Sequence, residues 1–138
     1  MSTDLKEYSS VTIASDIKHL SQAEALVEQA CNDLNVPTDY FGNILIAVTE
    51  AVNNAIRHGN NSDVSKSVAI AVMSDEHQVV FQVKDAGIGF DFTDLPDPTS
   101  PENLEKENGR GIFLMKALAD EVSFEDGGSK VLLNFNKA

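Results

Sequence analysis

Several residue types are scarce in this chain of 138 residues. It contains one cysteine, Cys31, and no tryptophan. A single cysteine cannot form an internal disulfide, so we expect a buried, inert thiol, which fits a reducing compartment. The chain has no run of about 18 apolar residues, which excludes a transmembrane helix. Residues 1–7 lack a basic region followed by an apolar one, so we expect no secretory signal and a cytoplasmic protein.

Basic residues are also few. The chain has 10 Lys and Arg against 22 Asp and Glu, which gives a formal net charge of -12. Binding nucleic acid through its phosphates requires a basic surface, so this charge argues against that function. Solubility alone explains the acidity. The alternative is that an acidic face binds a basic partner protein.

The stretch 41–60 combines a core helix with polar groups. Its apolar residues recur at helical spacing, and they are Phe41, Leu45, Val48, Val52, Ala55 and Ile56. A second face carries polar residues three and four positions apart, namely Glu50, Asn53, Asn54 and Arg57. Because asparagine is a poor helix former, two in succession indicate a polar site within a core helix. We expect His58 to be a helix-end cation rather than a catalytic base, and Gly59 to be the C′ residue that ends the helix.

The remaining pattern predicts one domain, spanning residues 1–138, that buries one sizeable core. The expected elements are a strand at 5–14, an amphipathic helix at 16–34, a hairpin of strands 68–73 and 79–84, a helix at 112–119 and closing strands at 122–125 and 131–135. A polar segment of roughly 18 residues, from about 91 to 108, is typical of a functional lid or of disorder. This order predicts an α/β (α+β) two-layer sandwich, with a mixed, mainly antiparallel sheet and helices on one face.

The first glycine motif, Asp85-Ala-Gly-Ile-Gly89, follows the second strand of the hairpin. Two glycines two positions apart let the backbone approach a ligand closely. Asp85, at the end of the strand, can accept hydrogen bonds from an amine. The alternative for the whole motif is an ordinary Gly-rich turn. The motif is not a dinucleotide-binding fingerprint, because no helical pattern follows it and Phe90 is bulky.

The second glycine motif, Gly109-Arg-Gly111, precedes the predicted helix 112–119. Free N–H groups and the helix dipole at a helix N-terminus suit phosphate, and Arg110 adds a positive charge. The alternative is a flexible start to the helix. A Walker-type loop is excluded, because no Gly-Lys-Ser or Gly-Lys-Thr follows a glycine at the required spacing.

Glu50 and Asn54 lie one helical turn apart and suit chemistry on a magnesium-bound phosphate. Mg²⁺ takes oxygen ligands and retains waters and phosphates, so the Asn54 amide oxygen is a plausible protein ligand. Glu50 can take a proton from a hydroxyl or a water. The alternative is a solvated polar face. Zinc is excluded because the histidines and Cys31 show no ligand spacing, and the chain has no Gly-x-Ser-x-Gly nucleophile elbow.

Three motifs taken together are specific: Thr49-Glu-Ala-Val-Asn-Asn-Ala-Ile56, Asp85 to Gly89, and Gly109-Arg-Gly-Ile-Phe-Leu-Met115. They resemble the N, G1 and G2 boxes of the histidine-kinase-like ATPase (Bergerat) fold, shared by the GHKL superfamily of gyrase, the heat-shock chaperone ATPase, sensor histidine kinases and mismatch-repair ATPases. Within that superfamily the chain looks most like the bacterial anti-sigma-factor serine/threonine kinases. The resemblance runs from Tyr8 to Phe135, nearly the whole chain.

The resemblance implies a role for each matching residue. Glu50 would be the general base, Asn54 would hold Mg²⁺, and Asp85 would accept from the adenine amine. An ATP lid would span about 92–108. The nucleotide-binding residues that it implies are Asn54, Asp85, Gly87, Ile88, Gly89, Asn108, Gly109, Arg110, Gly111, Ile112 and Ser129.

The same resemblance implies an ATP-dependent protein serine/threonine kinase with ATP and Mg²⁺ as cofactors. It would act as an anti-sigma factor, phosphorylate a serine on a small anti-anti-sigma antagonist, sequester a sigma factor and form a homodimer. Two alternatives stay open. One is an ATP-binding partner-switch module without kinase activity, and the other is a stand-alone histidine-kinase-type catalytic domain that acts in trans.

Overall fold

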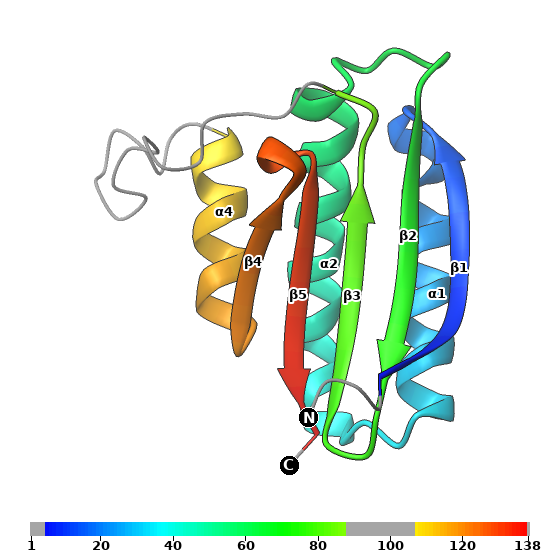
Figure 1. Ribbon diagram of the computed structural model, residues 1–138, viewed down its shortest axis with the longest axis vertical. Coiled ribbons are helices and arrows are strands. Elements are labelled where there is room, and N and C mark those ends of the chain that lie inside the picture. The colour runs from blue at the N-terminus through cyan, green and yellow to red at the C-terminus, as the bar shows by residue number, and fades with distance from the viewer. Residues whose placement is uncertain (1–4, 88–106, 138) are drawn as a thin grey trace.

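The computed structural model describes residues 5–87 and 107–137. For residues 107–110 it describes the backbone alone. It has two layers, a sheet and a set of helices that covers one face of it (Figure 1). The helices are α1 (Leu20–Asp33), α2 (Phe41–Asn54) and α4 (Glu107–Leu118). The strands are β1 (Lys6–Ala14), β2 (Ser67–Ser74), β3 (Gln78–Lys84), β4 (Glu121–Glu125) and β5 (Lys130–Asn136). The predicted two-layer sandwich with helices on one face is confirmed.

The strand order in the sheet is β1-β2-β3-β5-β4. Every pairing among the described residues is antiparallel, so the predicted mixed sheet was wrong in that detail. The crossover through α4 makes β4 run in the same direction as β3, which would give a parallel pair if the two were neighbours. They are not, because β5 lies between them (Figure 1).

The helix-covered face of the sheet is its apolar face. Ile70 of β2 pairs with Val83 of β3, and Val72 pairs with Phe81, and all four side chains are buried. The ring of Phe81 packs edge-on against Phe135 of β5, with ring centroids 6.1 Å apart. Alternation of buried and less buried residues along β2 matches the pattern from which the strand was predicted.

Helix α2 lies between α1 and α4 and contacts both of them (Figure 1). Its fully covered residues are Ile44, Ala47, Val48, Ala51 and Val52. This spacing of three and four positions produces one apolar stripe, which packs into the core. Because α2 packs against α1, α4 and the sheet, the polar residues of its C-terminal half have fixed positions.

The C-terminal end of α2 differs from the prediction. The chain continues as a π-helix over Ala55–Gly59, and the Asn60 N–H donates to the Ala55 carbonyl at 2.9 Å. Left-handed backbone occurs at Asn61 (φ 53°) and Ser62 (φ 56°), beyond the predicted C′ position. Gly59 is therefore not the C′ glycine, and its small size has another cause, described below.

Helix α4 begins at Glu107, five residues before the predicted start at Ile112. Asn108 to Gly111, which were predicted to precede the helix and to bind the nucleotide, are helical, and so is Glu107 of the predicted lid. Glycine costs about 1 kcal/mol in a helix relative to alanine, so local propensity favoured a loop here. Packing of α4 on α2 overrides that propensity. Residues 92–106 of the predicted lid lie outside the described residues.

The other boundaries deviate by a few residues. The predicted helix 16–34 begins as a 3-10 turn at Ile17–His19, which Asp16 caps by accepting from the Lys18 N–H at 3.0 Å, before α1 starts at Leu20. The closing hairpin turns through Asp126–Gly128 as predicted. Within the described part of the chain, none of the helices has the length and apolarity needed to cross a membrane.

Cys31 is buried on α1, as predicted, and burial raises the pKa of its thiol to about 11. The thiolate is the reactive form of cysteine, and a raised pKa lowers the fraction of thiolate at a given pH. A thiolate of higher pKa is the stronger nucleophile, which offsets part of this loss. We expect the native protein to react with Ellman's reagent at about pH 8 at least roughly tenfold more slowly than the urea-unfolded chain. Stopped-flow absorbance measures both rates. Equal rates would contradict a buried thiol.

Candidate functional site

Glu50 and Asn54 face the first turns of α4. A Cβ atom built on Gly111 would lie 3.1 Å from Asn54 Nδ2, 3.2 Å from Asn54 Oδ1 and 3.2 Å from Glu50 Oε2. Contacts this short are tighter than those of most Cβ atoms, so a side chain at position 111 would require Asn54 and Glu50 to shift. The α4 backbone therefore approaches the acid and the amide closely, and the first and third sequence motifs meet.

A second cluster forms around Asp85, which follows β3. A Cβ atom on Gly59 would overlap the Asp85 carboxylate, and one on Gly87 would overlap the Gly59 carbonyl. The Gly87 N–H donates to Asp85 Oδ1 at 2.8 Å. Gly59 is small because Asp85 packs against it. The π-helical turn that carries Gly59 continues directly from Asn54, so a single helical segment joins the two clusters.

The electrostatics of Asp85 suit an amine ligand. Burial raises the pKa of its carboxyl group above the ordinary value, while the Gly87 N–H and the charges of Lys84 and Lys66 act in the opposite direction. Burial is the largest of these effects. A partly desolvated carboxylate gains more from a new hydrogen-bond donor than one in water does.

Asn54 has an acceptor that is available to a ligand. Its Oδ1 atom is buried and has no hydrogen-bond partner among the described residues. A buried acceptor without a donor costs roughly 1–3 kcal/mol, so Asn54 Oδ1 is a candidate ligand atom for a bound group. An amide oxygen is a suitable ligand for Mg²⁺. The residues present at this place therefore fit a magnesium ion bound together with phosphates.

Ser129 lies beside Asp85, on the turn before β5. Its carbonyl accepts from the Asp85 N–H at 2.9 Å, and its hydroxyl donates to the Asp126 carbonyl at 3.0 Å. The side chain is buried. The Ser129 backbone contacts Asp85 and the hydroxyl serves the turn, while the implied nucleotide-binding role of Ser129 stays a prediction.

The other predicted site residues divide into three groups. Gly87 and Gly111 lie in the two clusters just described. Ile112 has a buried side chain in the hydrophobic core, so only its backbone can reach a ligand. In the last group, Ile88 and Gly89 lie outside the described residues, and only the backbone is described for Asn108, Gly109 and Arg110.

Asn60 is a buried polar residue that sequence reasoning missed. It is fully covered, and its Nδ2 donates to Ser15 Oγ at 2.8 Å and to the Ser67 carbonyl at 3.0 Å. Its Oδ1 accepts from the Ala86 N–H at 2.8 Å. In the sequence Asn60 opens a cluster of turn residues, and no local signal distinguishes it from Asn61.

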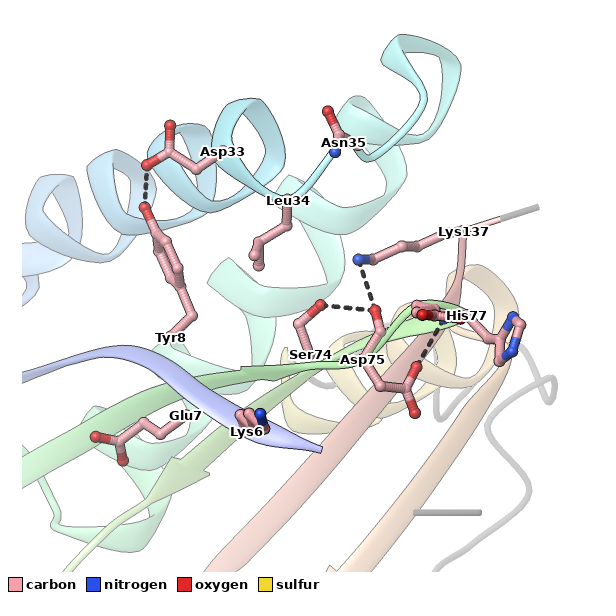
Figure 2. Close-up of a pocket in the computed structure, with 11 residues that line it drawn as sticks. Lys6, Glu7, Tyr8, Asp33, Leu34, Asn35, Ser74, Asp75, His77 and Lys137 are labelled. Atoms are coloured by element: carbon pink, nitrogen blue, oxygen red, sulfur yellow. Dashed lines mark hydrogen bonds between the residues drawn. The ribbon is translucent and has the colours of Figure 1, made fainter. Parts of the chain in front are cut away.

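A separate hollow of about 780 Å³ lies at the other end of the sheet, beside the turn between β2 and β3 (Figure 2). Tyr8 donates to Asp33 above it, and Lys137 Nζ donates to the Asp75 carbonyl at 2.8 Å. None of the predicted site residues that the structure describes lines it. The two clusters around Glu50 and Asp85, rather than this hollow, are therefore the candidate site.

The fold and both clusters define a class of protein. Residues 13–135 match the family described as histidine kinase-like ATPase domain. Because this range covers nearly the whole chain, the chain belongs to that family. The resemblance predicted from the three motifs is confirmed.

Individual relatives narrow the class. The serine-protein kinase RsbW of Bacillus cereus (strain AH820) is 30% identical over 109 residues, which cover 74% of this chain and 68% of that protein. RsbW of Bacillus thuringiensis (strain Al Hakam) gives the same identity and coverage. The crystal structure of the RsbU and RsbW domains of Rv1364c from Mycobacterium tuberculosis matches with a TM-score of 0.60 at 16% identity, covering 93% of this chain and 30% of that one. At that identity the structural match supports the fold alone.

Proposed function

We propose that this protein is an ATP-dependent protein serine/threonine kinase that acts as an anti-sigma factor. The observation that carries the proposal is the closeness of Glu50 and Asn54 to the α4 backbone at Gly111. It places a candidate general base and a candidate magnesium ligand beside the N-terminal turns of a helix. Similarity to RsbW, a serine-protein kinase, supports the choice of serine as the acceptor.

The proposed roles follow from the residue types. Glu50 takes the proton from the substrate hydroxyl, and Asn54 holds Mg²⁺. Mg²⁺, when bound with ATP, neutralises charge on the phosphates. The first turn of α4 has N–H groups without intrahelical partners, and Asn108 to Arg110 lie in that turn because the helix starts at Glu107. The earlier helix start thus suits phosphate at least as well as the predicted loop.

The proposed recognition of ATP uses the second cluster. The Asp85 carboxylate accepts from the adenine amine, and Gly87 lets the turn that carries Asp85 pack against Gly59. Phosphoryl transfer depends mainly on positioning and charge neutralisation, so a rigid link between the adenine-binding and phosphate-binding residues is useful. The continuous helical segment from Glu50 to Gly59 supplies that link.

The proposed protein partners come from the family resemblance. We propose that the substrate is a serine on a small anti-anti-sigma antagonist, that the unphosphorylated antagonist competes with a sigma factor, and that the kinase is a homodimer. The net charge of -12 is compatible with partners that present basic surfaces.

Labelling tests the proposal directly. The protein is incubated with Mg²⁺ and ATP labelled at the γ-phosphate, together with a candidate antagonist. The expected product carries acid-stable phosphate on serine. Acid-labile phosphate would instead indicate a histidine-kinase-type domain. Tight ATP binding with no labelling of any antagonist captured from the native cell would indicate a partner-switch module without kinase activity.

Asn54→Ala is expected to weaken ATP binding by roughly tenfold in the presence of Mg²⁺ and by much less in excess EDTA. The reason is that the amide oxygen interacts with the metal rather than with the nucleotide itself. Calorimetric titration under both conditions measures the difference. Asn43→Ala, an exposed amide on the same helix, is the matched control. An equal loss with and without Mg²⁺ would contradict the metal role of Asn54.

A further inference from the structure

We propose that Asn60 is a positioning residue of the nucleotide site, whose amide fixes the turn that presents Asp85 to the base. The inference rests on the proposed binding of ATP, since it assigns Asp85 to the adenine. Asn60 itself need not touch the nucleotide. It would act through the backbone of Ala86.

The amide of Asn60 joins three segments that are distant in the sequence. Nδ2 donates to Ser15, just after β1, and to Ser67, the first residue of β2, while Oδ1 accepts from Ala86, just after β3. Both amide hydrogens and the amide oxygen are therefore used. Because Asn60 is fully buried, no water competes for these bonds, and losing one leaves a buried group unpaired.

The turn after β3 depends on this amide. Its three consecutive N–H groups each have one partner: Asp85 donates to the Ser129 carbonyl, Ala86 to Asn60 Oδ1 and Gly87 to the carboxylate of Asp85. Among the described residues, Asn60 alone supplies a side chain from outside the turn to hold it. Loss of that bond frees the residue next to Asp85, while the core beneath β3 stays packed.

Ser15 offers a matched control. Its hydroxyl donates to the Lys66 carbonyl at 2.8 Å and accepts from Asn60, and neither of these hydrogen bonds involves the turn. Ser15→Ala therefore removes buried hydrogen bonds of the same network and leaves the bond between Asn60 and Ala86 in place. A purely structural role of the network predicts similar effects of Ser15→Ala and Asn60→Ala on nucleotide binding.

The test compares the affinity for ATP with that for inosine triphosphate, which lacks the exocyclic amine. Both variants are assayed by calorimetric titration at a temperature where circular dichroism shows them to be folded. We expect Asn60→Ala to lose roughly tenfold in ATP affinity and little in inosine triphosphate affinity, so that the preference for ATP falls. Ser15→Ala is expected to lower the melting temperature but to keep the preference.

Asn60→Asp is the rescue variant for the turn, because it retains an acceptor for the Ala86 N–H while it loses the donors to Ser15 and Ser67. It is expected to keep the preference for ATP, and it decides the matter if Asn60→Ala does not fold. Unchanged preference in folded Asn60→Ala, or its loss in folded Asn60→Asp, would overturn the inference while leaving the proposed kinase intact. If the wild-type protein binds neither nucleotide, the proposed function itself fails.

Discussion

Glu50→Gln is expected to slow phosphoryl transfer to the protein substrate by about 10²–10⁴-fold, while ATP affinity changes little. Glutamine keeps the size and hydrogen-bonding capacity of glutamate but cannot take the proton of the serine hydroxyl. Single-turnover labelling with saturating ATP measures the transfer rate. A separate nucleotide titration measures the affinity.

The surroundings of Glu50 make this substitution informative. The Glu50 carboxylate lies close to Gly111 of α4, and glutamine is nearly isosteric with glutamate, so the substitution preserves the packing. A loss of activity therefore reports on the missing base rather than on packing. Glu28→Gln, an exposed residue of α1, controls for the change in net charge. Equal labelling by wild type and Glu50→Gln would mean that another group accepts the proton.

The strands and the core could be predicted from the sequence because they follow local periodicity. Val68, Ile70 and Val72 alternate with less buried residues, and the two-residue period of a strand directs all three to one face. Glu50 and Asn54 were placed together for a similar reason, since four positions make one helical turn. Such inferences need only the geometry of a single element.

The errors arose where a contact from elsewhere in the chain decides the local structure. Gly59 satisfies the usual rule for a helix end, yet it is small because Asp85 packs against it. Gly109 and Gly111 favour a loop by propensity, yet the packing of α4 on α2 makes them helical. In both cases a glycine that marks close approach has the same local sequence signal as a glycine that marks a turn.

Local rules also do not predict that the two clusters form one site. That Asp85 and Gly111 belong to one site stays a prediction, which rests on the resemblance of three separated motifs to a known family. Asn60 belongs to none of those motifs, and its three partners come from three different segments. A residue that acts by joining distant backbone segments is visible only in the folded structure.

Asp85→Asn is expected to weaken ATP binding by about 1.5–3 kcal/mol, roughly 10–150-fold, because it removes a charge-assisted hydrogen bond to the adenine amine. Asparagine can still accept from the Gly87 N–H, so the turn should persist. Calorimetric titration measures the loss, and Asp39→Asn, exposed in the 3-10 turn Thr38–Tyr40 before α2, is the matched control. Unchanged affinity would mean that the adenine binds elsewhere.

The same substitution should stabilise the protein without nucleotide. Burial raises the pKa of Asp85 in the folded state, so ionisation of this group opposes folding progressively as the pH rises from the ordinary pKa through the raised one. Denaturation at neutral pH is therefore expected to show Asp85→Asn as more stable than wild type, with the difference vanishing as the pH falls below the ordinary aspartate range. Conversely, ATP affinity of the wild type should decline as acidification protonates Asp85, while that of Asp85→Asn stays flat.

Opposite pH trends in stability and in ATP affinity would show that the carboxylate is retained for binding at the expense of folding. A stability difference between Asp85→Asn and wild type that persists in acid would contradict this account.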